Sequence, residues 1–286
     1  MPEPEGIDRL DQLEQLVEAI QTRPSGPGLF SATPPDWWGP RVFGGMVVAQ
    51  SLDAALQTVD PTHRPHSLHG YFLRPLLPAV PCHLRVEHLR DGRSFALRQV
   101  TVEQGQGPAA RFMCSFHVDE FGDEYQLPMQ DVDEPDSLPP SGMPGPFDSR
   151  DAGPRRDPSD GAYLSTARLW HRACGPLGDD PRVHACLLSY LSDMTRTSFR
   201  PLSLDVWGAH TDASIDHTVW FHRPMRADEW VLSDFQAVIN AGNRSVVRGT
   251  MYTRAGVLSM SMTQELLIRR VGEPVELPPW LTAGDP

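Results

Sequence analysis

The sequence contains no lysine, and all 25 of its basic residues are arginines. A Schiff-base lysine, a pyridoxal-phosphate lysine and the lysine of a phosphate-binding P-loop are therefore excluded. Any phosphate that this protein recognises must be held by arginine side chains or by backbone N–H groups.

Cysteine is scarce, with four residues in a chain of 286. Cys82, Cys114, Cys174 and Cys186 form no CxxC pair and lie in no Cys/His cluster with the spacing of a zinc site. Three of them lie in apolar stretches, which is typical of small buried hydrophobic residues. We therefore expect no disulfide framework, no bound metal and no cofactor.

Long apolar runs are absent as well. No segment approaches the roughly 20 consecutive apolar residues that a membrane-spanning helix needs. The first residues, Met1–Glu5, are acidic and lack the apolar stretch of a secretory signal. We expect a cytoplasmic protein without stable membrane insertion.

Positive charge is in deficit, because 37 acidic residues give the chain a formal net charge of −12. This balance argues against nucleic acid as a partner. The deficit is local: the segment from Asp119 to Asp160 holds twelve acidic residues and three arginines, so the rest of the chain is much closer to neutral. An anionic ligand is not repelled if its site lies away from this segment.

What the sequence does contain is one pattern that occurs twice. Ser67–Pro75 and Ser214–Pro224 each contain two adjacent aromatic residues and end in Arg-Pro. Each is followed by an Arg-Ser pair, at Arg93 and at Arg244. The copies lie about 150 residues apart, near half the chain length, which predicts two copies of one unit rather than a solenoid of short repeats.

Each copy has the periodicity of a helix followed by an antiparallel sheet, which predicts an α+β fold in which a helix covers one face of a sheet. An amphipathic helix is also expected near the start of the chain, at about residues 7–20. The first copy is expected to hold a helix at about 45–59 and strands at 67–72, 82–89, 94–104 and 110–118. The second is expected to hold an apolar stretch at 183–191 and strands at 214–222, 230–239, 244–253 and 257–268.

The acidic segment between the copies contains eight prolines among its 42 residues and little periodicity. It is too long for an ordinary loop and is typical of a linker. We expect an N-terminal unit at residues 1–120, a Pro-rich acidic linker at 121–160 and a C-terminal unit at 161–286.

Several motifs together resemble the type II acyl-CoA thioesterases, the TesB-like family. They match in order from about Phe30 to Arg270. The matching segments are Arg41–Gly45, His66–Pro75, Asp91–Phe95, Tyr190–Asp193, Ile215–Pro224 and Gln264-Glu265. The resemblance implies a double hotdog fold, in which each tandem unit packs a long helix on an antiparallel sheet. It also implies hydrolysis of acyl-CoA to free fatty acid and CoA, and a homodimer or homotetramer.

The family's catalytic set is an Asp, a Ser or Thr and a Gln, which fall on Asp193, Ser214 and Gln264. A thiolate leaves easily, since its conjugate acid has a pKa of roughly 8.5, so the demanding steps are water activation and oxyanion stabilisation. Asp193 is the expected base, and the other two are expected to orient water. Without the family, the favoured reading of Asp193 is a helix N-cap. Ser214 is disfavoured as a nucleophile because GxSxG is absent.

A second group of residues is expected to contact the substrate. Gly44 and Gly45 precede the first-copy helix, and glycines there can expose N–H groups that bind an oxyanion or a phosphate. Met46 and His69 complete this group. Met46 stands where the family usually has Gln, which affects the expected polarity and acyl preference of the pocket.

The two copies differ in their polar residues. Aligned by spacing, the pairs are Gly45 or Met46 with Asp193, Ser67 with Ser214, and Ser115 or Phe116 with Gln264. The first copy thus has hydroxyl groups but no carboxylate, and Asp193 is expected at the start of the second-copy helix. We predict one active site per chain, carried mainly by the second copy.

Two alternatives remain open. A hotdog hydratase would need an Asp/His pair at the substrate, with His217 or His222 supplying the imidazole, and a non-catalytic protein would bind acyl-CoA without turnover. Asp216 and His217 are adjacent, so on a strand they point to opposite faces and are poorly placed to share a proton. Structural packing is the favoured role for these two residues and for His66 and His69.

Overall fold

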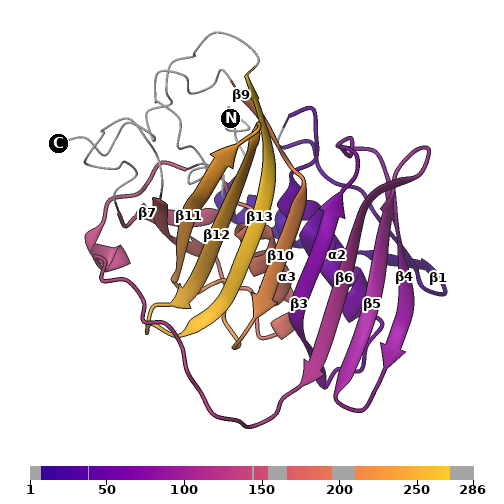
Figure 1. Cartoon of the computed structure of the whole chain (residues 1–286), viewed down its shortest axis with the longest axis horizontal. Helices are drawn as coiled ribbons and strands as arrows, with labels where there is room; N and C mark the ends of the chain where they lie inside the picture. The colour runs from indigo at the N-terminus through magenta and orange to yellow at the C-terminus, as the bar shows by residue number, and fades with distance from the viewer. Residues whose placement is uncertain (1–7, 38, 144, 154–165, 195–209, 271–286) are drawn as a thin grey trace.

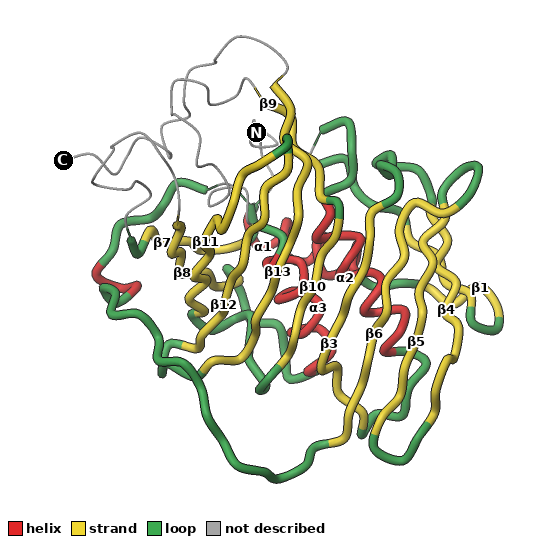
Figure 2. Tube along the Cα trace, in the orientation of Figure 1, coloured by secondary structure: helices red, strands yellow, loops and turns green. Residues whose placement is uncertain are grey.

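One antiparallel sheet joins both copies of the repeated pattern (Figure 1). The computed structural model describes residues 8–37, 39–143, 145–153, 166–194 and 210–270. Within these residues the sheet has 13 strands, in the order β1-β2-β4-β5-β6-β3-β10-β13-β12-β11-β8-β7, with β9 paired to β13. Three α-helices lie against one face of this sheet (Figure 2). We call the opposite face the outer face.

The first half of the chain forms two helices and six strands. In order, these are α1 (Arg9–Ile20), β1 (Arg23–Gly26), β2 (Leu29–Ala32), α2 (Gly44–Leu56), β3 (His63–Phe72), β4 (Cys82–Asp91), β5 (Phe95–Glu103) and β6 (Pro108–Val118). Helix α2 is apolar on almost all sides and is buried along nearly its whole length, as expected for a helix enclosed by other elements. It packs against β5 and β6 on one side and against the second-half helix on another.

The second half repeats this arrangement with additional short elements. In order, these are the 3₁₀ turn η1 (Pro135–Ser137), β7 (Phe147–Asp151), β8 (Thr166–Ala173), α3 (Pro181–Ser192), β9 (His210–Ser214), β10 (Asp216–Phe221), β11 (Val231–Ala241), β12 (Arg244–Thr253) and β13 (Leu258–Arg270). Asp180 caps the start of α3, where its side chain accepts a hydrogen bond from Arg182 N.

The repeated motifs form the junction between the halves. Strand β3 pairs with β10, from Ser67 opposite Trp220 to Tyr71 opposite Asp216. Because equivalent strands pair antiparallel, the halves are related by an approximate twofold axis through this junction. Helices α2 and α3 lie side by side behind it and run antiparallel, so the start of α2 meets the end of α3 (Figure 2).

The acidic segment covers part of the outer face of the second half. Its apolar residues Met129, Val132 and Leu138 pack on a cluster that includes Trp170 and Tyr252. In Figure 1 the segment leaves the end of β6 and runs along the lower edge of the molecule toward β7. The outer face of the first half has no such cover among the described residues. Side chains of β4 alternate between buried and exposed, and the exposed ones lie on this outer face.

Most of the predicted elements are confirmed, including a helix followed by an antiparallel sheet in each half. Strands β1, β2 and β8 were not predicted, and two further details differ. The strand expected at 214–222 is interrupted at Ile215, which separates β9 from β10. The acidic segment contributes strand β7, paired with β8, instead of being wholly irregular. Residues 154–160 of that segment lie outside the described residues.

Candidate active site

Asp193, Ser214 and Gln264 meet at one point although they come from three separate elements. Asp193 is the C-cap of α3, Ser214 ends β9 and Gln264 lies on β13. Gln264 Nε2 donates to Ser214 Oγ at 2.8 Å and also to Asp193 Oδ1. Ser214 Oγ lies 3.4 Å from the same carboxylate oxygen. Each of the three side chains therefore contacts the other two.

The position of Asp193 corrects the sequence alignment. It follows the last turn of α3, with φ −88° and ψ 0°, and is neither an N-cap nor the start of a helix. Because α2 and α3 are antiparallel, the end of α3 lies against the start of α2, where Gly44 and Gly45 stand. The glycine pair and Asp193 are thus neighbours in space, not equivalents in the two halves.

Gly44 and Gly45 are required by this close approach. A Cβ at Gly44 would lie 2.6 Å from Asp193 Oδ2, and one at Gly45 would overlap the Tyr190 carbonyl oxygen. Met46 N already donates to Phe43 O at 3.0 Å, so its N–H is engaged. The first N–H groups of α2 belong to Gly44 and Gly45, at the positive end of the helix beside the carboxylate.

Asp193 and Ser214 border a cavity of about 490 Å³. Asp193 is 4% exposed and Gln264 is fully buried behind it, so the carboxylate lies at the inner end of the site. The remaining wall is mostly apolar and includes Val42, Phe43, Val47, Phe72, Leu73, Leu76, Ile215 and Leu266. Arg41 and Arg74 stand among the polar residues that line the same cavity. The arrangement offers an apolar chamber, a base and cationic groups.

His217 lies behind Asp193, in the interior. It is fully buried, and its Nδ1 lies 4.0 Å from Asp193 Oδ1. Its Nε2 is 2.8 Å from Ser192 Oγ, and that hydroxyl donates to Ser189 O at 2.7 Å. Burial lowers the pKa of His217 to about 3, so the ring is neutral near pH 7 and its contact with Asp193 is not an ion pair.

Two expected substrate contacts lie elsewhere. His69 is exposed on the outer face of β3, where its ring meets Trp220 edge to face at a centroid distance of 5.2 Å. Met46 is 1% exposed and packs in the core, while Val47 lines the cavity. Gly44 does border the cavity, and Gly45 follows it at the start of α2. The structure therefore brings the glycines to Asp193 but not Met46 or His69.

The alignment of Ser115 with Gln264 is wrong by one residue. Ser115 lies outward and contacts His66 Nε2 at 2.7 Å, whereas its neighbour Cys114 is fully buried and faces the helices, as Gln264 does. A shift of one residue on a strand moves a side chain to the other face. Ser67 likewise pairs with Ser115 and Trp220 on the outer face, away from the position of Ser214.

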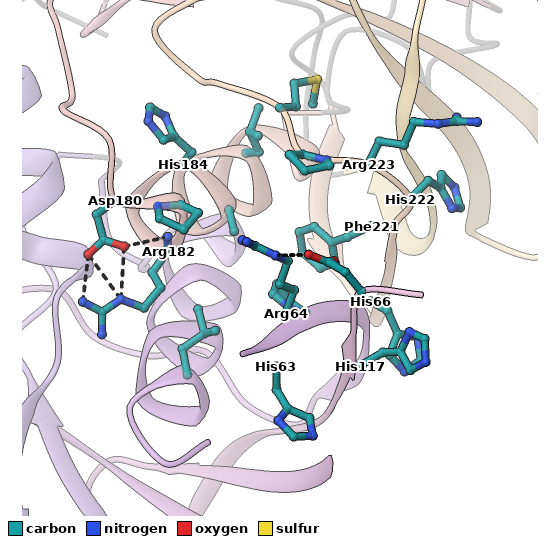
Figure 3. Close-up of a pocket in the computed structure, with 18 of the residues that line it drawn as sticks. His63, Arg64, His66, His117, Asp180, Arg182, His184, Phe221, His222 and Arg223 are labelled. Carbon is teal, nitrogen blue, oxygen red and sulfur yellow. Dashed lines mark hydrogen bonds and ion pairs between the residues drawn. The ribbon is translucent and has the colours of Figure 1, made fainter. Parts of the chain in front are cut away.

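A larger cavity, of about 950 Å³, lies at the other ends of α2 and α3 (Figure 3). By the approximate twofold axis it is the counterpart of the Asp193 cavity. At its wall Gln57 caps the C-terminus of α2, as Asp193 caps that of α3. Its histidines and arginines are mostly engaged, as in the pairs Arg64–Asp119 and Arg182–Asp180. The Gln57 amide therefore occupies in this cavity the place that the Asp193 carboxylate has in the other.

Comparison with known proteins identifies the family of this chain. The model of the acyl-CoA thioesterase N-terminal domain matches residues 33–117, and the model of the C-terminal domain matches residues 124–268. The chain belongs to the acyl-CoA thioesterase family. Acyl-CoA thioesterase 2 of Haemophilus influenzae is 30% identical over 281 residues, covering 91% of this chain and 98% of that one. Human acyl-coenzyme A thioesterase 8 is 29% identical over 266 residues, covering 82% of each chain.

The solved structures confirm the double hotdog fold. The crystal structure of an acyl-CoA thioesterase II from Mycobacterium marinum superposes with a TM-score of 0.80 at 35% identity and covers 89% of this chain and 98% of that one. Two further observations concern the described residues alone. None of their helices combines the length and hydropathy of a membrane span. No group of three or more His, Cys, Asp or Glu residues among them could hold a metal ion.

Proposed function

We propose that this protein hydrolyses acyl-CoA thioesters to free fatty acid and CoA, with Asp193 as general base and with Ser214 and Gln264 orienting the attacking water. The observation that carries the proposal is the mutual contact of these three side chains at the inner end of an apolar cavity. Membership of a thioester hydrolase family supports the same reaction.

The reaction follows from these groups. Water attacks the thioester carbonyl carbon and passes a proton to the Asp193 carboxylate. The tetrahedral intermediate then collapses, the C–S bond breaks, and the CoA thiolate takes the proton back from Asp193. Because a thiolate leaves readily, Asp193 need not act as a strong acid. The products are a fatty acid and the CoA thiol.

The start of α2 supplies the other requirement of this reaction. N–H groups at a helix N-terminus stabilise a developing negative charge in a cavity of low polarity. We assign this role to the N–H groups of Gly44 and Gly45, which lie beside Asp193. Val47, Phe72 and Leu266 are then placed to contact the acyl chain.

Replacement of Asp193 tests the proposal directly. Asp193→Asn keeps the shape of the side chain but removes the base, so thiol release from acyl-CoA should fall by about 10²- to 10⁴-fold. Thiol release is measured over a panel of acyl-CoAs of graded length, which also identifies the preferred chain. An Asp193→Asn enzyme with undiminished thiol release would refute the assignment of the base.

Matched controls come from residues outside the proposed site. Asp216→Asn changes a carboxylate that accepts from Glu265 N on the other side of the strand. Ser67→Ala and Ser115→Ala change first-half hydroxyls on the outer face. All three should keep thiol release within about twofold, since none of these side chains borders the Asp193 cavity. A loss comparable to that of Asp193→Asn would mean that both halves take part in the chemistry.

The hydratase alternative is disfavoured by the burial of His217. That ring does not line the Asp193 cavity, and its two nitrogens face Ser192 and Asp193, not the cavity wall. His222 borders the larger cavity and contacts Ser261 Oγ at 2.8 Å.

Three finer expectations remain proposals. We propose units at residues 1–120 and 161–286 joined by a linker at 121–160, a cytoplasmic location, and a homodimer or homotetramer. Exposed aromatic side chains near the β3–β10 junction, Tyr71 and Trp220, support self-association. Sedimentation velocity of the purified protein distinguishes the oligomeric states.

A further inference from the structure

We propose that His217 is a positioning residue that assists Asp193 by accepting a hydrogen bond from its carboxyl group once that group has taken the proton of water. This inference deepens the proposed function and rests on it. It concerns a residue whose sequence neighbour, Asp216, suggested a different pairing. The carboxylate within reach of the ring is Asp193, at 4.0 Å from His217 Nδ1, and not Asp216.

The hydrogen bonds around Ser192 define which ring nitrogen carries the proton. The Ser192 hydroxyl donates its only hydrogen to Ser189 O, at 2.7 Å. Its oxygen, 2.8 Å from His217 Nε2, can then only accept, so Nε2 carries the ring hydrogen. In a neutral imidazole Nδ1 is left with a lone pair, which faces Asp193.

That lone pair has no partner in the resting protein. Nδ1 is buried, without a hydrogen bond within the described part of the chain, although a buried polar atom without a partner is costly. Asp193, when ionised, offers no hydrogen to it. Once Asp193 has accepted the proton of water, its O–H can turn to Nδ1 and close the 4.0 Å gap.

The consequence for catalysis is specific. The new hydrogen bond forms only after proton transfer begins, so it stabilises the transition state and not the bound substrate. Such an interaction raises kcat and leaves KM unchanged. It makes Asp193 easier to protonate, so its loss should move the acid-side midpoint of the kcat–pH profile to lower pH.

The first half of the molecule suggests which residue should replace His217. Val219 on β10 pairs with Leu68 on β3, and in the repeated motif Leu68 takes the place that His217 has in the second half, with both side chains fully buried. His217→Leu therefore installs a residue of similar size that this fold already accommodates at the equivalent position. It removes the ring nitrogen with little change in packing.

The experiment compares His217→Leu with a matched histidine variant. His171 is also fully buried, contacts a serine (Ser149 Oγ, 2.9 Å) and has an unpartnered ring nitrogen, but it lies on β8. His217→Leu should lower kcat for thiol release by about 10- to 100-fold with KM within about twofold, and shift the acid-side midpoint downward. His171→Leu should change neither.

Two further variants test the proposal if His217→Leu does not fold, and test whether the ring acts through Asp193. Ser192→Ala removes the hydroxyl that fixes the ring, and it should lower kcat in the same direction if His217→Leu does not fold. In Asp193→Asn, adding His217→Leu should cause no further loss, because the ring acts only through the carboxylate. Unchanged kcat in a folded His217→Leu or Ser192→Ala enzyme, or additive losses in the double variant, would overturn the proposal. Failure of Asp193→Asn to lose activity would instead refute the proposed function.

Discussion

At the scale of single residues, the site depends on what is absent as much as on what is present. The hydrogen atom that serves as the side chain of Gly44 leaves room for Asp193 Oδ2 against the start of α2. Any larger residue would separate the carboxylate from the N–H groups that are proposed to bind the oxyanion. The glycine pair is thus a condition for the geometry of Asp193.

Gly44→Ala tests this dependence. The added Cβ would lie 2.6 Å from Asp193 Oδ2 and 3.2 Å from Phe72 Cζ, so the carboxylate must move. We expect kcat to fall by about 10- to 100-fold, because small displacements of a catalytic group are costly. Gly122→Ala is the control, since a Cβ there meets nothing within 4 Å. Equal activities of the two variants in a thiol-release assay would contradict the prediction.

The sequence predicted the three catalytic candidates but not their surroundings. Asp193, Ser214 and Gln264 could be named because a family pattern spans them. The contact between Asp193 and His217 could not, because it joins a helix end to a strand that lies 24 residues later and packs beneath it. Met46 packs in the core and His69 lies on the outer face, because a motif names residues without defining which face of an element each side chain occupies.

At the scale of elements, local periodicity identified α2 and most strands of the sheet. It failed where tertiary contacts decide the structure. Strand β7 is five residues long and lies in a Pro-rich segment, and it is a strand because β8 pairs with it. Strand β9 was merged with β10 because a single residue, Ile215, separates them. Short edge elements carry too few residues to show a period.

The acidic segment is held to the second half by apolar packing and by hydrogen bonds, among them those of Gln126 with Gly256 and Leu258. Trp170, which is 1% exposed, donates from Nε1 to Asp133 O at 3.0 Å. Trp170→Phe should lower the free energy of unfolding by about 1–3 kcal/mol, since it removes this hydrogen bond and leaves a cavity where the buried indole ring was. Urea denaturation measures the effect, and thiol release should be unchanged.

Arg254→Ala is the comparison for this prediction. Its side chain forms ion pairs of 2.8 Å with both Glu134 and Asp136, on the surface of the protein. Exposed ion pairs contribute little in water, so this variant should unfold near the wild-type urea concentration. If Arg254→Ala is the more destabilised of the two, then charge and not burial holds the segment.

At the scale of the whole molecule, two buried neutral histidines link stability to pH. Burial lowers the pKa of His217 to about 3 and that of His171 to about 4, whereas both titrate near 6.5 in an unfolded chain. Above pH 6.5 both histidines are neutral in the folded and in the unfolded protein, so the free energy of unfolding is not lowered by their protonation. As pH falls below 6.5 the unfolded chain binds protons that the folded protein excludes, so stability declines.

The expected loss of stability at low pH is large enough to measure. Between pH 6.5 and 5 each histidine should lower the free energy of unfolding by roughly 2 kcal/mol. Urea denaturation at pH 7, 6 and 5 gives this dependence. In His217→Leu the decline over the same range should be smaller by the share of one histidine. A decline identical to that of the wild type would show that His217 is already protonated, or exposed, in the folded protein.

The junction of β3 and β10 has a consequence for how the two halves could diverge. In a dimer of two identical short chains, every substitution appears on both sides of the twofold axis. Here one polypeptide holds both sides, so Asp193 can stand opposite Gln57, and His217 can occupy the place that Leu68 has in the other half. Linking the units in one chain gives each position two independent codons, which allows one half to specialise in chemistry while the other is selected for packing.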